Sequence, residues 1–490
     1  MQFLEELTKH LEADNQDILE EFLMRHGKFL FDTEKIVENY GLLKDRTYQK
    51  AEVRLLLAWL AQLSGDNMKL AALSRGLKEE DLEDEWRAFY YDLQALSGLF
   101  GEVSERLAYS DQSLNILQKM DVNFFHANAY LTRGQIHNGL KEYRDAYHYF
   151  YKAHEAFLQE EMMFPASVAL TNALLNKTRM AQFDSCIKIG KQSMLMASSR
   201  SDQLRYWDVL YLPMGISYLE QNHVMLALEY LKKAKKAIDD LGLIHMHGYL
   251  ELYLFKAYKL HNDVNTLKDV LGETKKLFET MRYPLMTQII KYGELLCDDY
   301  LSLAEIEELK MMYLEDKDPQ SFLVEMLVYL GNKNKEEYLD FDSFISFIHK
   351  NRTEGNLIDL QVLLLLLCDY YYVNGEIEDA KVILEEALQY KNQHKLTGAF
   401  YLYPYECWSL IEKMDSSMKR ASSSQPYFTE KELEVLKLME EGITNKEIGE
   451  RLFISVGTVK WHINHILSKL DVKNRVQAVH EARKMGIFKD

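Results

Sequence analysis

The chain is poor in residues that interrupt helices and in residues that form covalent cross-links. It has only 6 prolines in 490 residues, and strand-like alternation of apolar and polar residues is almost absent. Its four cysteines (Cys186, Cys297, Cys368 and Cys407) are scattered and form no CxxC pair. This usage argues against a disulfide framework or a zinc site and indicates buried thiols in a reducing compartment. We therefore expect an all-α, cytoplasmic protein.

Long apolar runs are missing as well. The longest one, residues 362–368, lies between Asp359 and Asp369 and is far too short to span a bilayer. The first residues, Met1 to Glu6, are acidic early and lack the basic-then-apolar order of a signal peptide. We expect no membrane association.

Motifs that carry catalysis or bind nucleotides are also absent. There is no GxSxG, no HExxH and no glycine-rich phosphate loop. His462 and His465 are spaced like metal ligands, but no cysteine or acidic third ligand is placed nearby, and the His245/His247 pair is weaker still. We therefore expect that the protein is not an enzyme and that it has neither a cofactor nor a metal site.

Small and apolar residues recur in the long N-terminal part with a fixed spacing. Three stretches align without gaps: Gly134, His137, Ala146, Phe150 and Ala153; Gly215, Tyr218, Ala227, Leu231 and Ala234; Cys368, Tyr371, Ala380, Leu384 and Ala387. Weaker copies pass through Cys186 and Leu267, so the period is about 40 residues. Small residues at fixed offsets let antiparallel helices pack closely, which predicts an α-solenoid like that of tetratricopeptide repeats over residues 1–412. The regions near Leu70 and Leu107 begin the array.

A serine-rich stretch with few helix formers follows the repeats. Residues 413–426 contain Ser416, Ser417 and a run of three serines at 422–424 before Pro426. Such a composition is typical of a flexible linker. It separates the repeats from a small domain, residues 427–490.

The first half of this small domain has the signals of two short helices. Thr429 and Glu432 have the spacing of a capping box, and Gly442 follows at the place of a C-terminal glycine. A second helix begins near Asn445, and Ile448 and Leu452 form its inner face.

A third and a fourth helix follow. Ser455 caps the third, along which Val459, Ile463, Ile466 and Leu470 form one apolar stripe. Lys460, Trp461 and Asn464 fall outside that stripe and face outward together. The fourth helix extends from about residue 474 to 484. Two short helices joined by a tight polar turn are the sequence form of a helix-turn-helix.

This segment resembles the LuxR-type (GerE-like) DNA-binding domain of bacterial transcription regulators, a four-helix unit. The matching positions are Glu432, Val435, Leu436, Gly442, Asn445, Lys446, Glu447, Ile448, Leu452, Ser455, Thr458, Val459, Lys460, His462, Ile466, Lys469, Leu470, Val472, Arg475 and Ala478. The resemblance implies sequence-specific binding of double-stranded DNA by a homodimer and regulation of transcription, with RNA polymerase as a further candidate partner.

The resemblance also assigns roles to residues. It places Lys460, Trp461 and Asn464 against base edges in the major groove. Phosphate-positioning contacts fall to five residues: Asn445, Lys446, Thr458, Lys469 and Arg475. The fourth helix is the usual dimer contact, which makes Val476 and Val479 interface candidates. The alternatives are that Lys460 is simply solvated and that Trp461 packs internally.

Charge is divided unequally between the two parts of the chain. The formal net charge is −18, which is unfavourable for DNA binding. Residues 426–490 contain 11 lysines and arginines against 10 aspartates and glutamates, so they carry +1 and the rest carries −19. From Lys446 onward there are 9 basic and 5 acidic residues. The acidic body would repel DNA, whereas the small domain would supply the attraction.

The 40-residue period is similar to that of the superhelical sensor domain of MalT-like regulators, although the nucleotide-binding module of those proteins is missing. This likeness implies that a small molecule, peptide or protein effector binds the repeats, at residues that the sequence does not identify. Tyrosines concentrated at 143–151 and 370–372 suit a ligand groove, but packing between repeats is the simpler interpretation. The alternative function is a protein–protein interaction scaffold whose terminal domain serves dimerisation or docking.

Overall fold

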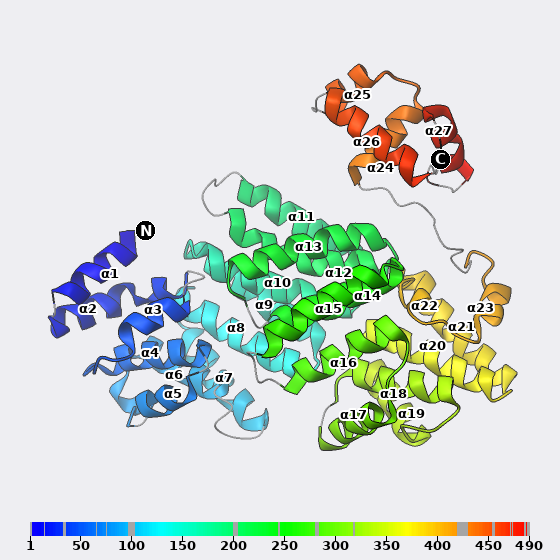
Figure 1. The fold of residues 1–490 in the computed structure, drawn as a ribbon. Coiled ribbons are helices and arrows are strands. Elements are labelled where there is room, and N and C mark those ends of the chain that lie inside the picture. Colours follow the sequence, from blue (N-terminus) through cyan, green and yellow to red (C-terminus); the bar gives the residue numbers. More distant parts are fainter. Residues whose placement is uncertain are drawn as a thin grey trace.

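The computed structural model describes residues 2–487, except 14, 33–35, 65, 75, 97–102, 199–203, 244–245, 280–283, 317–318, 419–429, 453–455, 471, 473 and 485–486. Every regular element in these residues is a helix (Figure 1). The prediction of an all-α protein is confirmed. No helix in the described part of the chain is both long enough and apolar enough to cross a membrane.

The N-terminal part contains α1 to α7. Their bounds are α1 Gln2–Glu12, α2 Gln16–His26, α3 Ile36–Leu43, α4 Ala51–Leu63, α5 Asn67–Ser74, α6 Asp84–Leu96 and α7 Val103–Leu117. The pairs α4/α5 and α6/α7 lie where the array was expected to begin.

Helices α8 to α21 follow, two to each successive repeat. They are α8 Phe124–Gly139 with α9 Tyr143–Gln159, α10 Met163–Arg179 with α11 Phe183–Ser198, α12 Tyr211–Glu220 with α13 Val224–Asp240, α14 His247–Leu260 with α15 Val264–Glu279, α16 Pro284–Asp298 with α17 Leu303–Glu315, α18 Ser321–Asn334 with α19 Phe341–Glu354, and α20 Leu357–Val373 with α21 Ile377–His394. The two helices pack on each other from α8/α9 to α14/α15 and in α20/α21, whereas α18 packs on α17 and α20. A 3-10 segment, Leu204–Leu210, precedes α12. The array is a helical repeat, and its assignment to the tetratricopeptide class stays a prediction.

Small residues on the first helix of a pair admit large residues from the second, as the spacing predicted. A Cβ atom added to Gly134 would lie 2.7 Å from the Phe150 ring, and one added to Gly215 would lie 2.9 Å from Cγ of Leu231. Phe150 and Leu231 are both buried. In these two pairs the recurring offset therefore marks a direct contact between the helices.

The turns inside the pairs share one backbone conformation. Lys141, Ala181, Asn222, Asn262 and Gly375 all have positive φ, between 52° and 83°. The residue after each one donates its N–H to a carbonyl five positions earlier, at 2.8–3.1 Å. This left-handed cap satisfies carbonyl groups at the end of the first helix and reverses the chain. It lies five residues before the repeat position 146, 186, 227, 267 and 380, so it has the same period.

A segment after the last pair lies inside the array. This inner segment, residues 395–405, includes the short α22 Ala399–Leu402. The N–H groups of Thr397 and Gly398 both donate to the carbonyl of Glu220, at 2.9 and 2.8 Å, and Lys395 Nζ lies 2.6 Å from Asp184 Oδ2. Figure 1 shows α22 close to α14 and α20, and both helices contact it. The inner segment thus joins the end of the array to its middle.

Buried polar groups meet the inner segment where it crosses α16 and α18. The hydroxyl groups of Tyr292 and Tyr403 both donate to Glu325 Oε1, each at 2.6 Å. Lys256 Nζ lies 3.7 Å from the other carboxylate oxygen, and the Tyr403 ring stacks on Tyr329 at 4.3 Å. Because a buried carboxylate is stable only when it is paired, these contacts tie Tyr403 firmly to α16 and α18.

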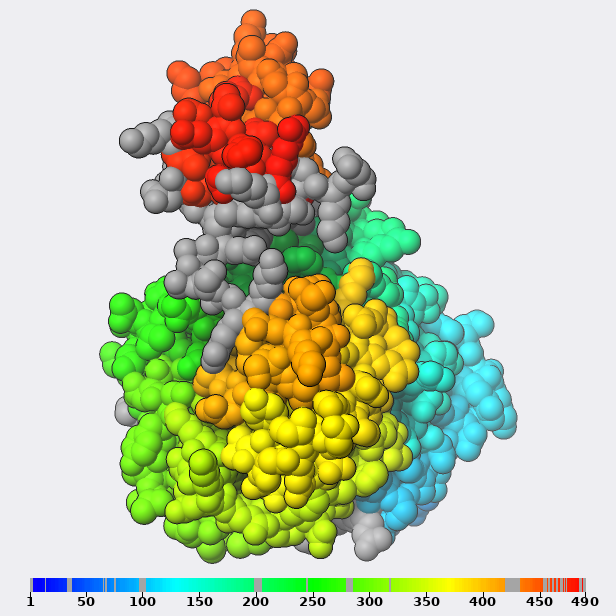
Figure 2. All heavy atoms as spheres, turned by 90° about the vertical axis from the view of Figure 1, so that its right-hand side faces the viewer, coloured from blue at the N-terminus to red at the C-terminus, as the bar shows by residue number. Residues whose placement is uncertain are grey.

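The packed body extends beyond the boundary predicted at residue 412. Helix α23, Trp408–Met414, crosses it, and Asp415 pairs with Lys391 at 2.7 Å. Met418 is 2% exposed and belongs to the body's core. Figure 2 shows α21 to α23, in yellow and orange, as one continuous surface. Of the predicted linker, residues 413–418 pack on the body, and residues 419–426 lie outside the described residues.

Candidate nucleic-acid interface

The four C-terminal helices build a core of their own. They are α24 Glu430–Glu440, α25 Asn445–Leu452, α26 Val456–Lys469 and α27 Arg475–Lys484. The predicted stripe of Val459, Ile463, Ile466 and Leu470 is buried and packs with Val435, Leu436, Met439, Ile448, Ala478 and Ala482. All members of this cluster lie between residues 433 and 487, so the unit has its own hydrophobic core.

The connection from α24 to α25 is a tight capped turn. Gly442 has φ +78°, as a C-terminal glycine requires. Thr444 immediately precedes α25, and its N–H and hydroxyl each donate to Glu447 Oε2 at 2.7 Å. These hydrogen bonds lower the pKa of Glu447, and the one from the backbone N–H of Thr444 has the larger effect. Thr444 and Glu447 thus form a capping box, and their T-x-x-E spacing in the sequence could have predicted it. The cap expected at Ser455 lies outside the described residues, as does that at Thr429.

Arg475 closes the unit from the fourth helix. Its Nη2 donates to the carbonyl of Ile443 at 3.0 Å and is 3.4 Å from that of Met439. These two carbonyls lie at the end of α24 and in the turn before α25, so the guanidinium fixes the position of α25 relative to α27. The structure therefore gives Arg475 an internal contact, which the sequence did not indicate; its predicted phosphate contact remains a prediction.

Apart from Arg475 on α27, the residues predicted to contact DNA lie on two successive helices. Asn445 and Lys446 begin α25, and α26 carries Thr458, Lys460, Trp461, Asn464 and Lys469. The side chains of Lys446 and Lys460 are exposed, and that of Asn445 is half-buried. For Thr458, Trp461, Asn464 and Lys469 only the place in the helix is described. The two exposed lysines put positive charge on both helices.

The predicted dimer contacts lie on α27. Val476 is 75% exposed, whereas Val479 is partly buried against the core of the unit. Val476 is therefore available to a partner, and Val479 also contacts the core of its own domain.

Within the described residues, one cluster of metal-ligand type lies in the body. Side chains of His137, Glu142 and Asp145 come within 4.8 Å of one another. However, Nδ1 of His137 is 2.5 Å from Glu142 Oε2, and Arg133 Nε lies 3.1 Å from Nε2. Both ring nitrogens are engaged by protein groups, so the cluster is explained without a metal.

A short capped helix packed against a longer one that carries an exposed lysine, Lys460, is the arrangement of a helix-turn-helix unit. Comparison with protein families agrees: the model described as "Bacterial regulatory proteins, luxR family" matches residues 426–482. The C-terminal part of this chain is a LuxR-family helix-turn-helix domain.

Curated relatives match the same part of the chain. The HTH-type transcriptional regulator AlkS of Alcanivorax borkumensis is 47% identical over 77 residues, which are 16% of this chain and 9% of the relative. The transcriptional regulatory protein LiaR of Bacillus subtilis is 66% identical over 50 residues, 10% of this chain and 24% of LiaR. The response regulator protein VraR of Staphylococcus aureus is 41% identical over 70 residues, 14% and 34% respectively. The chain thus matches about a third or less of the length of these relatives.

Proposed function

We propose that this protein is a sequence-specific DNA-binding transcription regulator. The observation that carries the proposal is the LuxR-family domain with its own core, in which Lys446 and Lys460 are exposed on α25 and α26. The relatives matched by this domain are named as transcription regulators, which supports the same role here.

In this proposal α26 lies in the major groove. Lys460 donates to guanine O6 and N7, Asn464 pairs with adenine N6 and N7, and Trp461 makes apolar contact with thymine methyl groups. Phosphate contacts from Asn445, Lys446, Thr458, Lys469 and Arg475 set the orientation without reading sequence. Two copies pair through Val476 and Val479 of α27, so the DNA site is an inverted repeat.

The helical repeats take the effector that controls DNA binding. The inner segment occupies space inside the array and buries Leu396, Phe400 and Tyr403 to 3% exposure or less. Displacing three such side chains costs about 1.5–3 kcal/mol each, so an effector that enters this space would have to offset a large part of the body's stability. This favours an effector site elsewhere on the repeats. RNA polymerase is a further candidate partner, as the family resemblance implies.

Selection of bound fragments from sheared genomic DNA tests the proposal. The wild-type chain should enrich a short inverted-repeat motif, and Lys460→Ala/Asn464→Ala should not. Lys437→Ala is the matched control, because Lys437 is exposed on α24, away from the two helices that contact DNA. If no motif is enriched by the full chain or by residues 426–490, the scaffold alternative replaces the regulator.

A further inference from the structure

A cavity lies between α18, α19 and α20 and the loop that joins α18 to α19. Its volume is about 250 Å³, just below the range of about 300–1,000 Å³ found for drug-sized ligands. It suits a ligand smaller than a drug-sized molecule.

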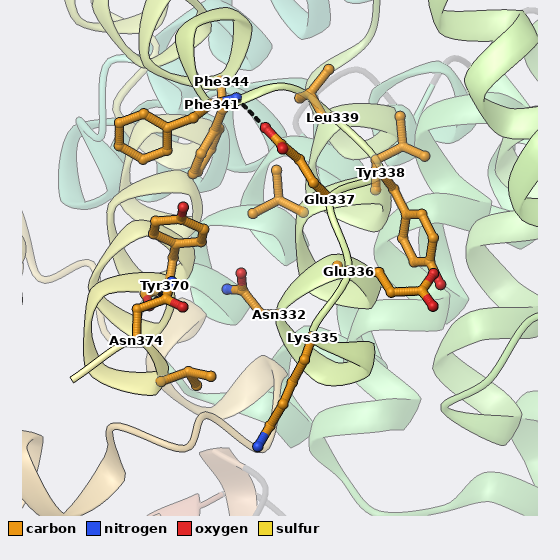
Figure 3. Close-up of a pocket in the computed structure, with 14 residues that line it drawn as sticks. Asn332, Lys335, Glu336, Glu337, Tyr338, Leu339, Phe341, Phe344, Tyr370 and Asn374 are labelled. Atoms are coloured by element: carbon orange, nitrogen blue, oxygen red, sulfur yellow. Dashed lines mark hydrogen bonds between the residues drawn. The ribbon is translucent and has the colours of Figure 1, made fainter. Parts of the chain in front are cut away.

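One side of the cavity is apolar and aromatic. Leu327 and Val328 of α18 are buried beneath it. The rings of Phe341 and Tyr370 stack at 5.1 Å with an interplanar angle of 27°, and Phe344 lies beside them (Figure 3). An aromatic or aliphatic body of a ligand would replace water along these surfaces.

The polar groups on this part of the cavity come from two amides and a carboxylate. Asn332 donates its amide N–H to the carbonyl of Leu366 at 2.9 Å, and Asn374 donates to that of Tyr370 at 3.0 Å. Each amide therefore keeps its oxygen as an acceptor and its second N–H as a donor for a ligand. Glu337 accepts from the Phe341 N–H at 3.0 Å with one carboxylate oxygen, drawn as a dashed line in Figure 3.

The charge of the lining is negative. It carries Glu336 and Glu337 against a single lysine, Lys335. In Figure 3 the Lys335 ammonium lies at the end of the cavity opposite Phe341 and Phe344. Aromatic faces attract a cation by about 0.5–2 kcal/mol, and the Glu337 carboxylate, which lies beside Phe341 in Figure 3, strengthens that attraction, whereas Glu336 turns toward Tyr338. A negatively charged ligand would be repelled by Glu337.

We infer that this cavity is a binding site for a small aromatic amine in its protonated form. The ring of the ligand packs on Phe341 and Tyr370, and its ammonium group donates to the carboxylate of Glu337, which lies beside Phe341 in Figure 3.

The wall of the cavity formed by α20 is connected to α23. Asp369 Oδ1 accepts from the N–H of Cys407 at 2.9 Å, where α23 begins. The hydroxyl groups of Tyr372 and Ser409 are 2.9 Å apart. Helix α23 in turn precedes the DNA-binding domain in the chain. The cavity is therefore the effector site of the proposed regulator. This regulatory role rests on the proposed function, whereas binding of the amine does not.

Three probes of similar size and different charge test the site on the full chain. They are 2-phenylethylamine, the neutral 2-phenylethanol and the anionic phenylacetate, each titrated by calorimetry at pH 7. The amine should bind at least tenfold more tightly than either of the others. Equal binding of all three, tighter binding of phenylacetate, or no binding of the amine would overturn the inference.

Two substitutions place the binding in the cavity. Val373→Phe fills it and should abolish amine binding, whereas Val382→Phe, at an exposed position of α21, should leave it unchanged. Glu337→Gln keeps an acceptor for the Phe341 N–H and removes the charge. It should weaken the amine at least threefold without affecting 2-phenylethanol, and it serves if Val373→Phe does not fold. Unchanged amine binding in Glu337→Gln would overturn the inference.

The two proposals fail separately. No DNA is present in the titrations, and no amine is present in the fragment selection. A chain that binds the amine and enriches no DNA motif keeps the site and loses the regulator. A chain that enriches a motif and ignores the amine keeps the regulator and loses the site.

Discussion

Lys460 and Lys446 are both exposed lysines of the DNA-binding domain, but they lie on different helices. Lys460 is on α26, which the proposal places against base edges, and Lys446 is at the start of α25, near phosphates. A contact with a base discriminates between sequences, whereas a contact with a phosphate does not. The two side chains should therefore differ in the kind of binding that they support, although their charges are the same.

We predict that Lys460→Ala lowers affinity for the selected motif by about 1–3 kcal/mol and relaxes the preference at one base pair. Lys446→Ala should weaken binding to all sequences similarly and reduce the salt slope by about one. Fluorescence anisotropy with matched duplexes over a range of salt concentrations measures both. An identical loss on motif and scrambled duplexes for Lys460→Ala would show that Lys460 contacts only the backbone.

Glu220 is a buried acid inside the array. Its pKa is raised to about 7, chiefly by burial. The positive charge of Lys256 lowers this pKa, and the negative charges of Asp359 and Glu325 raise it. In the unfolded chain a glutamate ionises near pH 4.3. As the pH rises from about 4.5 to 7, the unfolded state loses this proton while the folded state keeps it. The folded state therefore loses stability over that window.

We predict that Glu220→Gln becomes more stable than wild type as the pH rises, by about 2–3 kcal/mol between pH 5 and pH 8. Urea unfolding of the full chain at the two pH values, followed by helical circular dichroism, measures the difference. Glu385→Gln, on the exposed side of α21, is the control and should show none. A constant difference between wild type and Glu220→Gln would contradict the assignment.

At the level of elements, the inner segment is held by a close approach of two backbones. Gly398 has φ −57° and ψ −43°, which any residue adopts, but an added Cβ would lie 2.6 Å from the Leu219 carbonyl oxygen. Backbone atoms cannot move aside as a flexible side chain can. The position thus demands glycine for space and not for conformation.

We expect Gly398→Ala to destabilise the body by about 1–3 kcal/mol, the usual cost of overpacking. Gly272→Ala is a matched control, because Gly272 lies in α15 with no atom within 4 Å of an added Cβ, and alanine there should stabilise by about 0.5–1 kcal/mol. Denaturant midpoints compare the two. A harmless Gly398→Ala would mean that the inner segment is not tightly docked on α12.

The sequence predicted those elements whose signals are local. The offset from Gly134 to Phe150 and the stripe from Val459 to Leu470 follow from helical period, so the pairs and the terminal unit could be anticipated. The inner segment could not, because Lys395 pairs with Asp184 across 211 residues and no periodic pattern announces such a contact. The hydrogen bonds of Arg475 to backbone carbonyls could not be predicted either, because they join residues more than 30 positions apart. An arginine near a helix-turn-helix is first interpreted as a phosphate contact.

The cavity was equally invisible in the sequence. The tyrosines at 370–372 were noted, but only the packing of α18 against α20 and the loop before α19 places Tyr370 opposite Asn332 and Glu337. The tyrosines have different contacts in the structure: Tyr370 lines the cavity, and Tyr372 contacts Ser409 of α23. Their sequence positions alone did not distinguish these roles.

Across the whole molecule, charge is separated by domain. The body carries −19 and residues 426–490 carry +1, so the body disfavours the approach of DNA at low ionic strength. We predict that residues 426–490 bind DNA more tightly than the full chain at about 50 mM salt and that the gap narrows at about 200 mM, since screening shortens the range of repulsion. The core confined to residues 433–487 allows the fragment to fold alone. A gap that does not depend on salt would point to direct occlusion by the body.

The central claim is that α26 recognises a DNA sequence. The most direct test is the equilibrium affinity of the full chain for its enriched motif and for a scrambled duplex of the same length and composition, at one salt concentration. The account predicts a preference of about 10³-fold or more for the motif, lost in Lys460→Ala/Asn464→Ala and kept in Lys437→Ala. Equal affinity for the two duplexes would contradict it, because attraction would then come from charge alone.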